Sequence, residues 1–234
     1  MDKTQDLKPL EKKLSFSFSD KSLLSEALTH RSFLNEAKIS NLFSNERLEF
    51  LGDSVLSFWV AREIFLKFPK LPEGKLTFIK TYLVRTETLT GLAEKLSLGD
   101  YMRMSKGEEQ GNGRKNPVLL ANCFEAIVGA IFIDRGITLV FKFFEREFGP
   151  LIDGIKDPDK LKDSKSMLQE KVQAAGRSSP VYRLISSSGP DHDKKFRMGV
   201  YRDNTLLGEG ESHSKQEAEE EAAKVALENL PKIR

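Results

Sequence analysis

The most informative segment of the chain sets three carboxylates and one arginine among apolar residues, and it reads Asn45-Glu46-Arg47-Leu48-Glu49-Phe50-Leu51-Gly52-Asp53-Ser54. On a helix, residues three and four positions apart share a face, so Glu46, Glu49 and Asp53 form one line. Like charges in such a line repel each other by roughly 0.2–0.5 kcal/mol per pair. The residues that follow are apolar and are expected to be buried, and they are Val55, Leu56, Phe58, Trp59 and Val60. Unpaired charge next to a core is costly, and a bound divalent cation with carboxylate ligands would remove the repulsion.

A second polar pair lies in another apolar segment. Asn122 and Glu125 are three residues apart and share a helix face. Two helices that direct oxygen side chains inward can build a metal site in a helical core, and hard oxygens suit Mg²⁺ or Mn²⁺. The alternative is a solvated helix face, on which Arg47 and nearby lysines offset the acidic charge. The pattern alone leaves both interpretations open.

Length and composition limit the possibilities. At 234 residues and 26.5 kDa, the chain is long enough for one large domain or for one medium and one small domain. The net charge of +2 does not by itself indicate a nucleic-acid-binding protein, so any basic surface must be local. A single cysteine, Cys123, excludes an intrachain disulfide framework and favours a small apolar core role.

Targeting signals are not evident in the sequence. The N-terminal residues are charged and lack the apolar region of a signal peptide. No segment contains the ~20 consecutive apolar residues that span a bilayer. We therefore expect a soluble, cytoplasmic protein with no membrane partner.

The first two thirds of the chain have a helical pattern, with caps and prolines as boundaries. The expected helices cover residues 20–29, 45–68, 73–84, 117–131 and 137–148. A polar loop over 38–44 precedes the carboxylate helix, and Gly149-Pro150 is expected to end the last helix. The glycine-rich segment 105–116 lacks the Gly-Lys-Ser/Thr of a phosphate-binding loop, so it is expected to be a flexible loop.

The pattern changes after a polar linker at 153–163. A helix over 164–176 precedes three alternating segments typical of strands, and Ser214 caps a last helix over 215–229. The expected elements are strands 181–185, 196–201 and 205–208 between these two helices. The predicted fold is thus an all-α domain over 1–155, followed by a small α+β domain with the order α-β-β-β-α over 163–232.

The segment from Asn45 to Leu56 resembles the signature helix of the ribonuclease III family. The supporting matches are Ala27 to Ser32, Glu73-Gly74, Leu83 to Arg85 and Ala121 to Ala130. The resemblance implies an all-helical nuclease domain that forms a homodimer through the signature helix. It further implies cleavage of double-stranded RNA, including ribosomal RNA precursors, to 5′-phosphate and 3′-hydroxyl ends.

The resemblance also implies roles for individual residues. Glu49, Asp53 and Glu125 match catalytic, metal-coordinating residues, with Mg²⁺ as the ion and Mn²⁺ as a substitute. Asn122 stands at a metal position where most members of the family carry aspartate, so we expect an active site with weaker metal affinity. The remaining matches are Glu46 and Glu73 as auxiliary acidic residues, and Phe50 as a dimer contact.

The C-terminal segment resembles a double-stranded-RNA-binding domain. Such domains read duplex RNA by shape, through two minor grooves and the phosphates between them. The matching positions lie on the first helix, on the loop between the first two strands and at the start of the last helix, and they are Gln169, Glu170, Gln173, His192, Lys194, Lys195 and Lys215. The last helix of the family usually opens with a basic pair, whereas this chain has Lys215 followed by Gln216, which predicts lower phosphate affinity.

Other functions are possible from the sequence. A double-stranded-RNA-binding protein with weak or no cleavage would fit Asn122 and the missing basic residue, whereas the set of Glu49, Asp53 and Glu125 favours the enzyme. A helical phosphohydrolase acting on small nucleotides would leave the second domain unexplained. The three histidines have no metal-ligand spacing, and His30 is expected to be a structural hydrogen-bonding residue.

Overall fold

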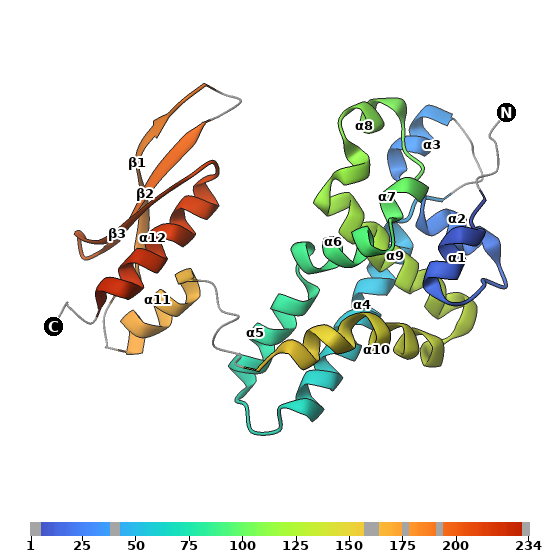
Figure 1. Cartoon of the computed structure of the whole chain (residues 1–234), viewed down its shortest axis with the longest axis horizontal. Helices are drawn as coiled ribbons and strands as arrows, with labels where there is room; N and C mark the ends of the chain where they lie inside the picture. Colours follow the sequence, from blue (N-terminus) through green and yellow to red (C-terminus); the bar gives the residue numbers. More distant parts are fainter. Residues whose placement is uncertain (1–5, 38–42, 157–163, 175–177, 191–193, 231–234) are drawn as a thin grey trace. The chain divides into compact units, whose positions relative to one another are not determined.

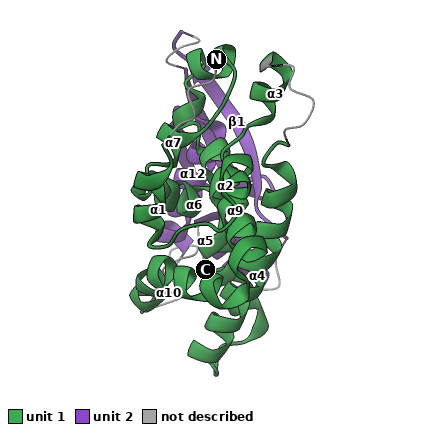
Figure 2. Cartoon of the chain, turned by 90° about the vertical axis from the view of Figure 1, so that its right-hand side faces the viewer, with its two compact units in different colours: residues 1–158 green, residues 159–234 purple. Residues whose placement is uncertain are grey.

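A computed structural model of the chain describes residues 6–37, 43–156, 164–174, 178–190 and 194–230. The chain divides into two compact units, residues 1–158 and residues 159–234 (Figure 2). Each unit has its own hydrophobic core and is described by itself.

The elements described in the first unit are all helices, as predicted (Figure 1). Its elements are α1 (Lys8–Leu14), α2 (Lys21–Ala27), α3 (Arg31–Ala37), α4 (Glu46–Lys67), α5 (Glu73–Val84), α6 (Thr86–Lys95), α7 (Leu98–Tyr101), α8 (Lys106–Gln110), η1 (Gly113–Lys115), α9 (Pro117–Arg135) and α10 (Ile137–Gly154). Helices α4 and α5 begin and end where the sequence predicts, to within one residue. Asn116 caps α9 by accepting the Val118 N–H at 2.9 Å, and α4 ends at Phe68, directly before Pro69.

Helix α9 is the central element of this unit and contacts α2, α4, α6, α7 and α10 (Figure 1). It is apolar on nearly every side, which is typical of a buried helix. Among the described residues, it is the one helix long and apolar enough to cross a membrane, yet Ala126, Ile127 and Ile131 are fully buried in protein. Cys123 also lies in this core, where burial raises the pKa of its thiol to about 12, which confirms its apolar role.

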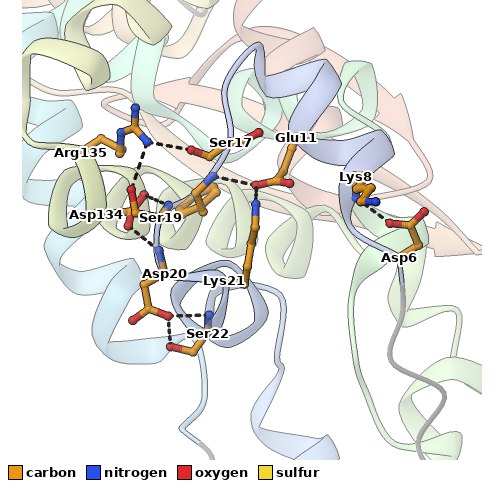
Figure 3. Close-up of polar contacts among 11 residues, drawn as sticks. Asp6, Lys8, Glu11, Ser17, Ser19, Asp20, Lys21, Ser22, Asp134 and Arg135 are labelled. Carbon is orange, nitrogen blue, oxygen red and sulfur yellow. Dashed lines mark hydrogen bonds and ion pairs between the residues drawn. The ribbon is translucent and has the colours of Figure 1, made fainter.

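Carboxylates of α1 and α9 fasten the N-terminal helices to the rest of the unit (Figure 3). Asp134, near the end of α9, accepts the backbone N–H groups of Ser19 and Asp20, each at 2.8 Å. Glu11 of α1 is only 6% exposed, and it accepts the Phe18 N–H at 2.7 Å while pairing with Lys21. Because the buried carboxylate of Glu11 has two donors, its charge is compatible with a folded core.

Three local predictions were wrong. Helix α10 continues through Gly149-Pro150 to Gly154, because the extra turn buries Ile152. The segment 105–116 contains α8 and η1, stabilised by the Ser105 cap on the Glu108 N–H at 3.2 Å. Phe58, which was expected in the core, is 59% exposed, because it lies roughly a third of a turn around α4 from Gly52, which contacts α9.

The second unit has the predicted order, with α11 (Ser164–Ala174), β1 (Val181–Ser188), β2 (Lys195–Arg202), β3 (Thr205–Ser212) and α12 (Lys215–Asn229). The strands form one antiparallel sheet in the order β1-β2-β3 and extend beyond the predicted ranges. Asp203 and Asn204 join β2 to β3 with φ of 47° and 69°, as a tight hairpin requires. The predicted end of the first helix at Gly176 and the loop residue His192 lie outside the described residues.

Close contact between β3 and α12 fixes the core of this unit. A Cβ at Gly210 would lie 2.3 Å from the Ala222 nitrogen, and one at Gly208 would lie 2.5 Å from the Ala222 oxygen. The predicted alanine face of α12 fits this short distance, and Ala222, Ala223 and Ala226 are all fully buried.

Candidate nuclease site and RNA-binding surface

The crossing of α4 and α9 is the feature that builds the candidate site. A Cβ at Gly52 of α4 would lie 1.8 Å from the backbone oxygen of Glu125. Reciprocally, a Cβ at Gly129 of α9 would lie 2.2 Å from the backbone oxygen of Leu48. The two helices therefore touch backbone to backbone, at a distance that only glycine permits at both positions.

This crossing brings together carboxylates that are about 70 residues apart in the sequence. Burial, followed by the charges of Asp53 and Glu49, raises the pKa of Glu125 to about 7. Burial, followed by the charges of Glu46 and Asp53, raises the pKa of Glu49 as well. Glu49, Asp53 and Glu125 thus lie within electrostatic reach of one another, and their negative charges repel.

The chemistry of these donors fits a hydrated hard cation. Within the described ranges, no three His, Cys, Asp or Glu side chains lie close enough to hold an ion as they stand. Mg²⁺ commonly keeps several waters and binds only one or two carboxylates directly, so it does not require a compact cage. The negative charge of the carboxylates would attract such an ion, and their oxygens and the Asn122 amide oxygen could bind it directly or through water.

A cavity of about 590 Å³ adjoins the crossing. It is lined by residues of α3, α4, α8 and α9 and of the segments before α3 and α4, namely His30, Arg31, Asn45, Glu46, Glu49, Glu108, Leu119 and Asn122. Asn122 therefore faces the same space as Glu46 and Glu49. His30 has the structural role predicted for it, because its Nδ1 bonds the Ser32 hydroxyl at 2.8 Å.

Two other predicted residues of this unit lie elsewhere. Glu73 begins α5, after the 22 residues of α4 have carried the chain roughly 30 Å from Glu46. It does not line the cavity in this chain. Phe50 lies on α4 between Glu49 and Asp53, and it is 78% exposed.

The predicted RNA contacts of the second unit lie on the surface. Gln169, Gln173 and Lys215 are exposed, and Gln169 and Gln173 share one face of α11. Lys215 opens α12 with its Nζ 5.8 Å from the centre of the Phe196 ring, so the start of this helix lies beside the start of β2. The remaining described candidates are Glu170 on α11, and Lys194 and Lys195 at the start of β2.

Acidic residues of α12 have partners within the unit. Glu219 pairs with Lys165 at 2.5 Å, and Glu220 accepts the backbone N–H of Ser164 at the start of α11. Lys165 also lies 4.8 Å from the centre of the Tyr182 ring. These carboxylates therefore hold α11 against α12, and Glu219 is partly neutralised near the expected phosphate contact.

Comparison with known proteins identifies the family. Residues 20–151 match the family described as Ribonuclease-III-like, and residues 164–230 match the double-stranded RNA binding motif. The chain belongs to the ribonuclease III family. It is an endoribonuclease with a nuclease domain followed by a domain for double-stranded RNA, as predicted.

Curated relatives resemble the chain over nearly its whole length. Ribonuclease 3 of Roseiflexus sp. (strain RS-1) is 44% identical over 223 residues, which is 94% of each chain. Ribonuclease 3 of Enterococcus faecalis is 41% identical over 222 residues, which is 95% of this chain and 96% of the relative. The crystal structure of the nuclease domain of ribonuclease III from Campylobacter jejuni matches 65% of this chain and all of its own, with 37% identity and a TM-score of 0.59.

Sequence reasoning missed several residues that shape the site. Gly52 and Gly129 each interrupt an apolar helix, and such isolated glycines signal close backbone approach. Arg31 and Glu108 come from segments distant in sequence from the acidic helices, so only the fold places them at the cavity.

Proposed function

We propose that this ribonuclease III hydrolyses phosphodiester bonds of double-stranded RNA with Mg²⁺, leaving 5′-phosphate and 3′-hydroxyl ends. The observation that carries the proposal is the α4–α9 contact at Gly52 and Gly129, which sets Glu49 and Asp53 opposite Glu125. Its substrates would be structured transcripts such as ribosomal RNA precursors, and its location the cytoplasm.

Glu49, Asp53, Asn122 and Glu125 would hold the ion. When bound, Mg²⁺ offsets charge on the phosphoryl oxygens and lowers the pKa of a coordinated water. Glu46 would support this end of the cavity, since the Ser44 hydroxyl fixes its carboxylate at 2.8 Å. Mn²⁺, which accepts similar oxygen ligands, would substitute.

A homodimer through α4 completes the proposal. Phe50, Phe58 and Phe65 recur seven or eight residues apart along α4 and are 78%, 59% and 66% exposed. Such a stripe is typical of a protein contact. A related structure from Campylobacter jejuni concerns flexibility in the region involved in dimer formation of its nuclease domain. If two α4 helices met antiparallel, Glu73 of the partner subunit would lie near Glu46 and so join the site.

The second unit would hold the duplex. Gln169, Glu170 and Gln173 would enter one minor groove, and the loop with His192, Lys194 and Lys195 the next. Lys215 would bind the phosphates between them, aided by the positive end of α12. The exposure of Gln169, Gln173 and Lys215 supports this assignment.

Cleavage of a long, end-labelled duplex RNA tests the function. With millimolar Mg²⁺, the wild-type chain should cut, and Glu125→Gln should cut at least about 10²-fold more slowly with unchanged RNA retention in a gel-shift assay. The exposed Glu145→Gln on α10 is the matched control and should cut normally. A wild-type chain that retains the duplex but cuts it with neither Mg²⁺ nor Mn²⁺ would establish the alternative, a binding protein without efficient cleavage.

Asn122 has a separate test. The amide can ligate Mg²⁺ without adding charge, so Asn122→Asp should lower the Mg²⁺ concentration needed for half-maximal cleavage. The hypothesis of an active wild-type site fails if only Asn122→Asp cuts.

For the dimer, Phe50→Asp should halve the mass seen by light scattering and leave the circular dichroism spectrum unchanged.

A further inference from the structure

Among the described residues that line the cavity beside the α4–α9 crossing, Arg31 supplies the one guanidinium. The same cavity presents the carboxylates of Glu46, Glu49 and Glu108. An RNA strand entering it carries a negative charge at every phosphate, and these carboxylates repel that charge. A metal ion at the α4–α9 crossing offsets the repulsion only at its own position, so phosphates farther along the strand need another cation.

The backbone around Arg31 is held from two sides. The Thr29 oxygen accepts the Asn45 N–H at 2.9 Å, which ties this segment to the start of α4. The Arg103 oxygen accepts the His30 N–H at 2.9 Å, which ties it to the segment before α8. Arg31 is the first residue of α3, so its side chain projects from a fixed point at the rim of the cavity.

The present partner of Arg31 is easily replaced. Its Nη1 lies 3.5 Å from the Glu46 Oε1, and the two side chains are 70% and 55% exposed. Exposed pairs with such geometry contribute little to stability. A planar guanidinium binds phosphate oxygens through two parallel donors, which is a stronger arrangement than this long single contact.

We propose that Arg31 binds a phosphate of the RNA strand next to the one that is cut. The guanidinium leaves Glu46 when RNA enters and donates to the non-bridging oxygens of that phosphate. Arg31 contacts Glu46 in a cavity whose lining contains neither Asp53 nor Glu125, so we assign it a neighbouring phosphate and not the one that is cut. This role rests on the proposed function and adds a substrate-binding residue to it.

Kinetics and salt dependence test the role in the full chain. Arg31→Gln should raise KM for a long duplex about tenfold, the value of one charge-assisted hydrogen bond, while kcat stays within about twofold. In a Glu125→Gln background, in which cutting is slow enough for binding to be measured, it should also reduce the slope of log affinity against log salt by about one. Arg31→Lys should restore part of the loss. Arg85→Gln is the matched control, because Arg85 is 46% exposed and lies 3.7 Å from Glu87, outside the cavity lining.

A role confined to neutralising Glu46 predicts different results. In that case, the effect of Arg31→Gln on RNA affinity would disappear when Glu46→Gln is also present, and the salt slope would not change. Either result overturns the proposal, as does an equal rise in KM for Arg85→Gln. An inactive wild-type chain would contradict the proposed function, whereas an active wild type with an unchanged Arg31→Gln variant would contradict the role of Arg31 alone.

Discussion

The α4–α9 crossing and the proposed RNA-binding surface of the second unit bring their candidate functional side chains together in different ways. At the crossing, two backbones touch, and Glu49, Asp53 and Glu125 are carried into place by that contact. On the second unit, Gln169 and Lys215 are exposed and lie on separate helices. A site built by backbone contact should fail abruptly when the contact is lost, whereas a surface of separate side chains should weaken in small steps.

Gly129→Ala gives the largest expected effect. The new Cβ would lie 2.2 Å from the Leu48 oxygen, so α4 and α9 must separate. We expect a loss of about 3 kcal/mol in the free energy of unfolding, since overpacking against rigid backbone costs about that much. Cleavage should fall even where the protein remains folded, because the separation also moves Glu125 away from Asp53. Urea unfolding and RNA cleavage at low temperature measure the two effects.

Gly91→Ala is the control for that substitution. Gly91 also lies within a helix, but a Cβ there meets nothing within 4 Å. Alanine should stabilise α6 by roughly 0.5–1 kcal/mol through lower unfolded-state entropy. Equal changes in the free energy of unfolding for the two substitutions would show that the crossing tolerates a side chain. The site at the crossing would then not depend on backbone contact.

The charge of Glu125 gives a smaller, pH-dependent effect. Its pKa is raised from 4.5 to about 7, so the folded state binds this proton more tightly than the unfolded state. The associated stability is present below about pH 4.5 and is lost as the pH rises to about 7. In metal-free buffer at pH 8, Glu125→Gln should therefore be more stable than wild type by about 1 kcal/mol, after solvent screening is allowed for.

Thermal melts with a chelator measure this difference, which corresponds to ~2–4 °C in Tm. The gain should vanish near pH 4.5, where wild-type Glu125 is protonated. Glu145→Gln, on the exposed face of α10, is the control for loss of a carboxylate. A gain of equal size at both pH values would mean that packing, and not charge, sets the stability of this position.

Local signals in the sequence predicted most of the fold. Helix α9 begins at Pro117 because Asn116 caps it, and α12 begins after Ser214 for the same reason. The break expected at Gly149-Pro150 did not occur, because burial of Ile152 holds one more turn of α10. Local propensity could not reveal that tertiary contact.

The sequence supplies the residue types of the candidate site but not the contact that brings them together. The spacing of Glu46, Glu49 and Asp53 placed them on one face of α4, but Glu125 joins them only through the crossing of two helices. The position of Glu73, roughly 30 Å along the chain from Glu46, follows from the length of α4 and could not be inferred from its acidic character. The sequence pattern shows which side chains carry oxygen donors, but it does not show which of them lie close together in the folded chain.

The smallest expected effects belong to the second unit. Lys215→Ala should reduce duplex affinity a few-fold, about 1 kcal/mol or less, and should lower the salt slope by about one, because it removes one phosphate contact. Gln169→Ala should have a similar effect on affinity without changing the slope, because an amide carries no charge. Exposed Lys171→Ala on α11 is the control for loss of a lysine.

The double variant Gln169→Ala with Lys215→Ala tests whether the side chains of the second unit contribute independently to RNA affinity. Gln169 and Lys215 lie on different helices, and separate sites usually contribute additively within about 0.5 kcal/mol. The fold-loss in duplex affinity of Gln169→Ala with Lys215→Ala should therefore equal the product of the two single fold-losses. Fluorescence anisotropy at fixed salt measures it. A loss far above that product would mean that the two side chains act as one unit. The RNA-binding surface would then depend on a fixed arrangement, as the crossing at Gly52 and Gly129 does.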